Sequence, residues 1–179
     1  CETCPASGTF DNIAQFIFKD SCATATCHVG TSPRGNLSLE AVSAHAALVN
    51  VVPSNAAAAT AGMKLVDPGH PENSFIMEKL CGSDPGDPAL RPAVCAGHDL
   101  QIGALAEGEP MPPPTGGMSE AKINLIHDWI AAGALASGWV PGTHCGVPPD
   151  LFEPIPAPPV PPGGFQLELP AYDLAPGQE

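Results

Sequence analysis

The chain has 179 residues, of which 19 are acidic and six are Lys or Arg, so its formal net charge is −13. This charge excludes nucleic-acid binding, which needs basic patches against phosphate, and makes a basic or neutral protein the expected docking partner. No apolar run is long enough to span a bilayer, and seven cysteines in a chain of this size predict an oxidising compartment. Aromatic residues make up 5%, whereas Pro (23) and Gly (19) are abundant, so we expect a small, loop-rich domain with a thin aliphatic core.

Residues 1–8 are expected to form an extended lead-in that contains Cys1 and Cys4. No signal peptide is present, which we expect of a chain that has been processed. Cys1 stands where a mature bacterial lipoprotein carries its lipid, so one hypothesis is membrane attachment through a lipidated Cys1. The alternatives are that Cys1 is half of a disulfide or only a chain boundary.

A helix is predicted from Thr9 to about Asp20, with Thr9 as its N-cap and Asp11 in its first turn. Apolar side chains recur along it at helical spacing, which is typical of a buried face. They are Phe10, Ile13, Phe16 or Ile17, and Phe18.

This helix leads into the motif Cys22-Ala-Thr-Ala-Thr-Cys27-His28. Two cysteines followed at once by histidine attach a c-type haem: each thiol adds across one vinyl group as a thioether, and the imidazole binds the iron. Two residues usually separate the cysteines. Here four do, and these small residues are expected to bulge away from the ring. The same side chains also allow a disulfide between Cys22 and Cys27, or a zinc site completed by a fourth ligand.

Two further helices are expected in the middle of the chain. Residues 29–36 are predicted to be a loop, and Ser38 to start a helix from Leu39 to about Asn50. Residues 51–62 are interpreted as a small-residue linker. The turn Asp67–Pro71 introduces a helix from Glu72 to about Leu80. The inward-facing residues are expected to be Leu39, Val42, Ala46 and Val49 in the first helix and Phe75, Ile76 and Leu80 in the second.

The last third begins with an irregular stretch, residues 81–110, bracketed by Cys81 and Cys95. A final helix is predicted from Glu120 to about Ala132, capped by Ser119 and ended by Gly133. Its apolar residues are Ile123, Ile126, Trp129 and Ile130. Residues 146–179 are rich in proline and predict an extended strap, followed by one strand-like segment at 165–172.

Met111 is our choice for the iron ligand opposite His28. It lies in a proline-rich loop before the final helix, where Pro112 and Pro113 would stiffen the approach to iron. A thioether favours ferrous iron and raises the potential relative to a second imidazole. The other methionines serve as comparisons: Met63, Met77 and Met118. A histidine is the main rival, His70 first among those in loops; the others are His45, His98, His127 and His144.

Several segments taken together resemble the cytochrome c-like domains of large bacterial secreted and envelope proteins. They are the Cys-His motif, Leu-Val-Asn-Val, Asp-Pro-Gly-His-Pro-Glu-Asn-Ser-Phe, Met-Pro-Pro, and Ile-His-Asp-Trp-Ile-Ala-Ala-Gly-Ala. The resemblance covers about residues 9–134. It implies an all-α fold around one covalent haem c, with His28 and Met111 of this chain as axial ligands. The segment 165–179 faintly resembles the start of a copper-dependent monooxygenase domain.

We therefore expect three parts: a lead-in at 1–8, a cytochrome c-like domain at 9–145, and a Pro-rich extension or linker to a further domain at 146–179. The expected function is single-electron transfer in the periplasm or at the outer membrane, feeding a linked or partner oxidoreductase, without independent catalysis. A haem enzyme with an open coordination site and a disulfide- or zinc-stapled interaction module are the alternatives. Arg34 or Lys79 is a candidate partner for a haem propionate.

Five cysteines remain after haem attachment. We predict the bridges Cys81–Cys95 and Cys4–Cys145, which leaves Cys1 for a lipid, although spacing alone does not determine connectivity.

Overall fold

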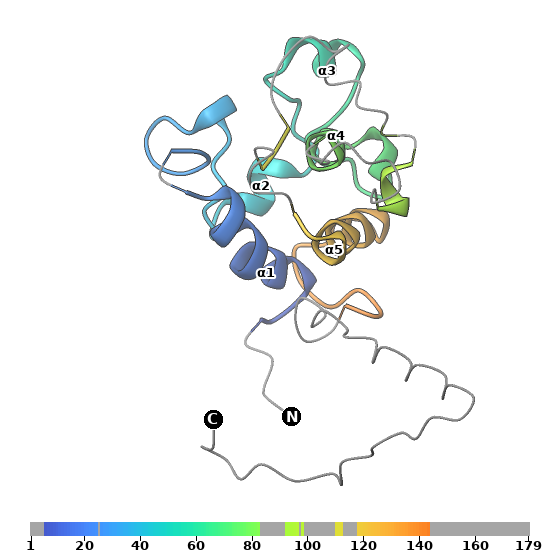
Figure 1. Cartoon of the computed structure of the whole chain (residues 1–179). Helices are drawn as coiled ribbons and strands as arrows, with labels where there is room; N and C mark the ends of the chain where they lie inside the picture. The colour runs from blue at the N-terminus through green and yellow to red at the C-terminus, as the bar shows by residue number, and fades with distance from the viewer. Residues whose placement is uncertain are drawn as a thin grey trace, which may run out of the picture.

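A computed structural model describes residues 6–24, 26–82, 92–96, 98, 110–112 and 118–143. The expectations for Cys1, Cys4, Cys145, His144 and the tail 146–179 lie outside these residues. The described part is helical and loop-rich (Figure 1) and contains no β-strand, only isolated bridges such as Gly8–Gly138 and Val49–Val66. The elements are α1 (Thr9–Ile13), the π-helix η1 (Ala14–Cys22), the 3₁₀ turn η2 (Arg34–Asn36), α2 (Ala44–Leu48), α3 (Ala56–Thr60), η3 (Pro71–Asn73), α4 (Phe75–Cys81), η5 (Ala93–Cys95) and α5 (Glu120–Ala131).

The first predicted helix is present, but it changes type. After Ile13 the chain continues as a π-helix to Cys22. Of the two alternatives offered by the sequence, Ile17 is fully buried and Phe16 only half-buried. The prediction that Thr9 caps the helix is wrong, because Gly8 holds the N-cap position. The Thr9 hydroxyl is instead engaged far along the chain: it lies 2.6 Å from the Thr143 hydroxyl and accepts the Val140 N–H at 2.8 Å.

The start of α1 is tied to the chain that follows α5. Gly138 O accepts the Thr9 N–H at 2.9 Å, which satisfies a donor that a helix start leaves unpaired. Asp11 reaches back to the Ser7 N–H at 2.7 Å, and this backbone hydrogen bond, with the Gln15 amide, lowers the pKa of its carboxyl. The two ends of the described domain therefore meet at one place.

Replacing Gly8 with alanine is expected to destabilise the domain by about 1–3 kcal/mol. A Cβ at Gly8 would lie 2.6 Å from Gly138 O and 2.8 Å from Gly138 N, and backbone atoms cannot yield as a flexible side chain does. Urea denaturation would measure the loss. Ser137→Ala, at an exposed neighbouring position, is the control and should change stability by less than about 0.5 kcal/mol. Equal midpoints for the two variants would contradict the close-approach explanation.

The second predicted helix is much shorter than expected. Only Ala44–Leu48 is helical. Of the four residues predicted to face inward, Leu39 is buried and Val49 packs against the core, but Ala46 is exposed and Val42 is 97% exposed. The cause is a tertiary contact: the Leu39 N–H bonds His28 O at 2.8 Å, which keeps residues 37–39 extended. This tertiary contact overrides the helical spacing of apolar residues in the local sequence.

The expectation of a linker at 51–62 is also wrong, because α3 lies within it. The Asn55 side chain accepts the Ala58 N–H at 2.9 Å and caps a run of alanines. An Asn before several alanines is a helix-start signal that the sequence did contain.

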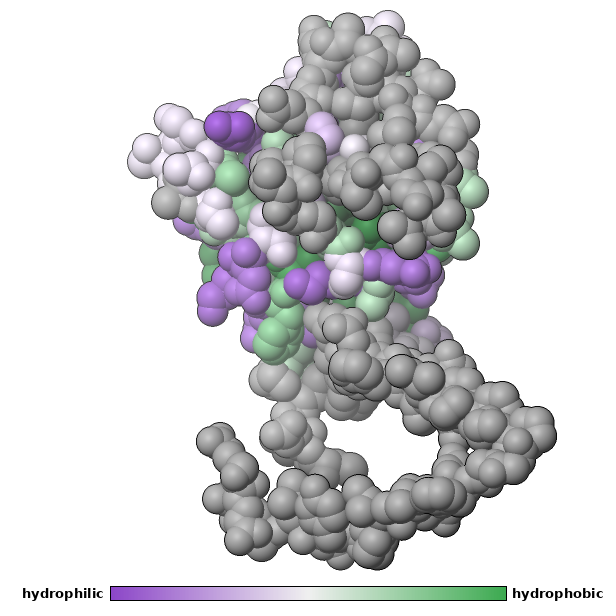
Figure 2. All heavy atoms as spheres, in the orientation of Figure 1, coloured by the Kyte–Doolittle hydropathy of each residue, from purple (hydrophilic) through white to green (hydrophobic). Residues whose placement is uncertain are grey.

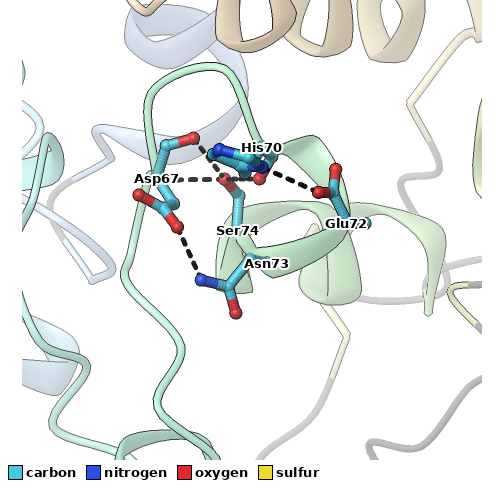
Figure 3. A network of polar contacts seen from close by, with 5 residues as sticks. All are labelled: Asp67, His70, Glu72, Asn73 and Ser74. Atoms are coloured by element: carbon cyan, nitrogen blue, oxygen red, sulfur yellow. Dashed lines mark hydrogen bonds and ion pairs between the residues drawn. The ribbon is translucent and has the colours of Figure 1, made fainter.

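The turn Asp67–Pro71 is confirmed, and Figure 3 shows why it holds its shape. The Ser74 hydroxyl donates to His70 O at 2.9 Å and accepts the Asp67 N–H at 2.9 Å, while the Asn73 amide donates to the Asp67 carboxylate at 2.6 Å. On its exposed side, the hydrogen bond with Glu72 raises the pKa of His70. Because Pro71–Asn73 is a 3₁₀ turn, α4 begins at Phe75 and not at Glu72.

The core forms where α5 packs against both α1 and α4 (Figure 1). The four apolar residues predicted for α5 are buried, and Gly133 follows its end with a φ of 98°, as expected; the Ser119 side chain, however, makes no capping hydrogen bond. Trp129 is fully buried with its ring 5.1 Å from that of Phe10, and its indole N–H donates to Leu135 O at 2.9 Å. On the face drawn in Figure 2, apolar (green) and polar (purple) groups alternate over the lower described helices. No helix in the described ranges is long and apolar enough to cross a membrane.

Candidate haem cavity

A cavity of about 350 Å³ opens between the end of η1, the loop 26–39, α2, α4 and the segment 110–112. Its lining includes all four residues predicted as haem ligands: Cys22, Cys27, His28 and Met111. The volume falls in the range typical of cofactor sites, roughly 300–1,000 Å³. Apolar side chains supply most of the wall, namely Phe18, Leu37, Leu39, Leu48, Pro53, Leu65, Phe75, Ile76, Leu80 and Pro112.

Cys22 reaches the cavity because η1 ends at it. The Ala23 N–H bonds Phe18 O at 2.6 Å, the i to i+5 pattern of a π-helix. Such turns are rare and concentrate at functional sites. The pKa of the Cys22 thiol is raised to about 11, mainly because the thiol is buried.

Backbone hydrogen bonds link the two ends of the attachment motif. The Cys27 N–H bonds Thr24 O at 2.9 Å, and the His28 N–H returns to Cys22 O at 3.2 Å. Thr24 and Thr26 are exposed and do not line the cavity. The Cys22 and Cys27 thiols are free, so the structure does not show the alternative disulfide between them.

In haem-free protein, Cys27 should be alkylated at least about ten times faster than Cys22 at pH 8. Hydrogen bonds from Thr24 and Thr26 lower the pKa of Cys27, whereas burial raises that of Cys22 to about 11. The higher thiolate fraction of Cys27 outweighs its weaker intrinsic nucleophilicity. Between pH 8 and 10 the Cys22 rate should still climb about tenfold per unit, because this range lies below its pKa, while the Cys27 rate levels off. Timed iodoacetamide labelling with peptide mapping measures both rates, and equal rates with parallel pH profiles would contradict the assigned environments.

The His28 ring is oriented by a backbone carbonyl. Its Nδ1 donates to Leu37 O at 3.1 Å, which fixes the tautomer and leaves Nε2 as the nitrogen with a lone pair. Metal-binding histidines commonly use their second nitrogen in this way. Sequence reasoning did not identify Leu37, because nothing in the pattern marks a carbonyl nine residues away.

Met111 is held at the cavity through its backbone. Its N–H bonds Lys79 O at 3.0 Å, one of the carbonyls that the end of α4 leaves unpaired. Met111 is the one methionine among the described residues that lines the cavity. Met63 packs with Ala58 and Phe75, Met77 is fully buried in the core, and Met118 packs against the edge of that core.

The described histidines that rivalled Met111 lie away from the cavity. His70 is exposed beside Glu72, and His127 contacts Asp128. His45 Nε2 donates to Ala134 O at 2.8 Å. His98 is buried against Glu78. Within the described part, no three His, Cys, Asp or Glu side chains gather as a metal-ion site would require.

Two cations, Arg34 and Lys79, also line the cavity. The Arg34 N–H bonds Cys27 O at 2.8 Å, so this residue is fixed beside the attachment turn. Lys79 Nζ lies 5.2 Å from the centre of the Phe75 ring. A flat, apolar ligand with carboxylate groups matches this combination of apolar walls and two cations. Thiols can bond to haem vinyl groups, and an imidazole and a thioether can bind haem iron.

Comparisons with protein-family models, curated proteins and solved structures found no match to this chain.

Proposed function

We propose that this chain is a mono-haem c-type cytochrome domain that carries single electrons in the bacterial cell envelope. In this proposal Cys22 and Cys27 hold the haem covalently, and His28 and Met111 are the axial ligands. One observation supports this proposal. The two thiols, the imidazole and the thioether that the sequence singled out all line the same apolar cavity, although Met111 lies 83 positions beyond His28.

The haem, when bound, supplies an iron that exchanges one electron. The other roles belong to residues of the chain. Leu37 O holds the His28 ring in one orientation, and Lys79 O holds the Met111 backbone, so both ligands are set before any change of charge on the metal. The apolar wall would exclude water, and Arg34 and Lys79, which also line the cavity, would pair with the haem carboxylates.

Because His28 and Met111 would both bind the iron and leave it no open position, we propose electron transfer without independent catalysis. The chain's formal charge of −13 favours a basic or neutral redox partner, either a separate protein or a linked oxidoreductase. Membership of the cytochrome c-like family, a location in the periplasm or at the outer membrane, and a lipid on Cys1 belong to the same proposal.

The test is the optical spectrum of the full chain produced in a host that matures c-type haem. A sharp reduced α-band, a far-red sulfur-to-iron band in the oxidised protein and haem retained on a denaturing gel are the expected results. A colourless protein would favour the alternative of a disulfide- or zinc-stapled interaction module. Rapid carbon monoxide binding by the ferrous protein would instead favour a haem enzyme with an open site.

A further inference from the structure

Three contacts from later parts of the chain converge on the last turn of α4. The predicted disulfide Cys81–Cys95 is present. His98 Nδ1 donates to Glu78 Oε1 at 2.8 Å, and Lys79 O accepts the Met111 N–H at 3.0 Å. We call the first two of these contacts, the Cys81–Cys95 disulfide and the Glu78–His98 hydrogen bond, the α4 clamp.

The Glu78–His98 contact is buried on both sides. The side chains are 9% and 6% exposed, and Glu78 Oε2 has no hydrogen-bond partner among the described residues. Buried ionisable pairs contribute little net stability but are strongly disruptive when one partner is removed. A pair of this kind therefore fixes geometry more than it adds to the free energy of folding.

The described residues 92–96 and 98 are fastened to α4 at two points. The Cys95 N–H bonds Pro92 O at 2.9 Å, and the His98 N–H bonds Cys95 O at 3.1 Å. The disulfide at Cys95 and the side chain of His98 then attach this short turn to α4 at two successive points. Two attachments prevent the turn from rotating about either one.

The clamp also shortens the stretch of sequence between Met111 and the preceding residue that is attached to α4. Without it, about 29 residues separate Cys81 from Met111; with it, about 12 separate His98 from Met111. The probability that a flexible loop closes falls as about the 3/2 power of its length, so the shorter loop returns Met111 to Lys79 about four times more often.

We infer that the α4 clamp holds Met111 at the cavity, and that Glu78 and His98 are positioning residues for the thioether ligand. For the role at the iron this inference rests on the proposed function; for the Met111 backbone it rests on the contacts alone. The histidine that resembled a metal ligand beside Cys95 in the sequence thus acts through Glu78 and α4.

The first test uses the haem-loaded full chain. His98→Gln and Glu78→Ala should raise the rate of carbon monoxide uptake by the ferrous protein about tenfold, because Met111 is released more often, with covalent haem unchanged. Glu78→Gln keeps an acceptor for the His98 N–H and should restore most of the wild-type rate. The double variant Cys81→Ser/Cys95→Ser should act in the same direction and also weaken the far-red band.

Trp129→Phe is the matched control. It removes the hydrogen bond from the indole N–H to Leu135 O, which is none of the contacts on the last turn of α4, so it should lower Tm without changing carbon monoxide uptake. If His98→Gln lowers Tm to a similar degree and leaves the uptake rate unchanged, His98 is only a structural residue and the inference is overturned.

The second test does not depend on haem. Hydrogen exchange of the Met111 amide, measured in the full chain as purified, should be about tenfold faster in His98→Gln than in Trp129→Phe. Faster exchange in a colourless protein would sustain the clamp while the proposed function fails. Unchanged exchange would overturn the clamp whatever the spectrum shows.

Discussion

Replacing Cys22 and Cys27 together with serine is expected to abolish covalent haem. Serine hydroxyls do not add to the vinyl groups as thiolates do, so any porphyrin in the cavity would be held only by non-covalent contacts and would leave on acid extraction. Haem staining of a denaturing gel measures this directly, with complete loss as the expected result. Each single variant should keep one thioether, and its reduced α-band should move to longer wavelength because one vinyl group stays conjugated with the ring.

The chain offers a matched control for these cysteines. Cys81→Ser/Cys95→Ser also removes two sulfurs, but they belong to the disulfide beside α4 and not to the cavity lining. That variant should keep its covalent haem in full. If haem survived on the gel in the Cys22/Cys27 variant and was lost in the Cys81/Cys95 variant, the attachment site would be assigned wrongly.

Met111→Ala is expected to leave haem attached but to open the iron. The far-red band should disappear, and the ferrous protein should bind carbon monoxide rapidly, because no other methionine among the described residues lines the cavity. Met111→His should restore a closed iron but lower the potential by on the order of 0.1 V or more, within the roughly 0.8 V that axial ligation spans. Spectra and a redox titration measure both effects.

Met77→Leu serves as the control for Met111. Met77 is fully buried in the core, and a swap of similar volume should cost less than about 1.5 kcal/mol while leaving band and potential in place. A far-red band that persisted in Met111→Ala and vanished in a Met63 or Met118 variant would identify a different ligand.

How far the sequence predicts this structure depends on which forces act locally. The helices around Phe10–Phe18 and Ile123–Ile130 follow from apolar spacing, because their buried faces are continuous stripes along the chain. The predicted helix around Val42 failed because a hydrogen bond between Leu39 and His28 keeps the chain extended.

The candidate site also contains some groups that the sequence reveals and others that it does not. The identity of Cys22, Cys27, His28 and Met111 follows from side-chain chemistry and spacing, which the sequence displays. The groups that orient these side chains cannot be predicted in this way. Leu37 O and Lys79 O are backbone carbonyls, which every residue type supplies, so no residue type in the sequence indicates them. The switch to π geometry at Ala14 was likewise missed, because π-helices are rare and their i to i+5 hydrogen bonds join backbone groups that every residue type carries.

The meeting of Gly8 with Gly138 and of Thr9 with Thr143 has a mechanical consequence. Chain enters and leaves the described domain at this one seam, and no residue of 6–17 or 118–143 lines the cavity. Tension applied through sequence on either side would load the seam first and would bypass the cavity. Neighbouring parts of a larger assembly could then swing about this attachment while the arrangement of the cavity residues stays constant.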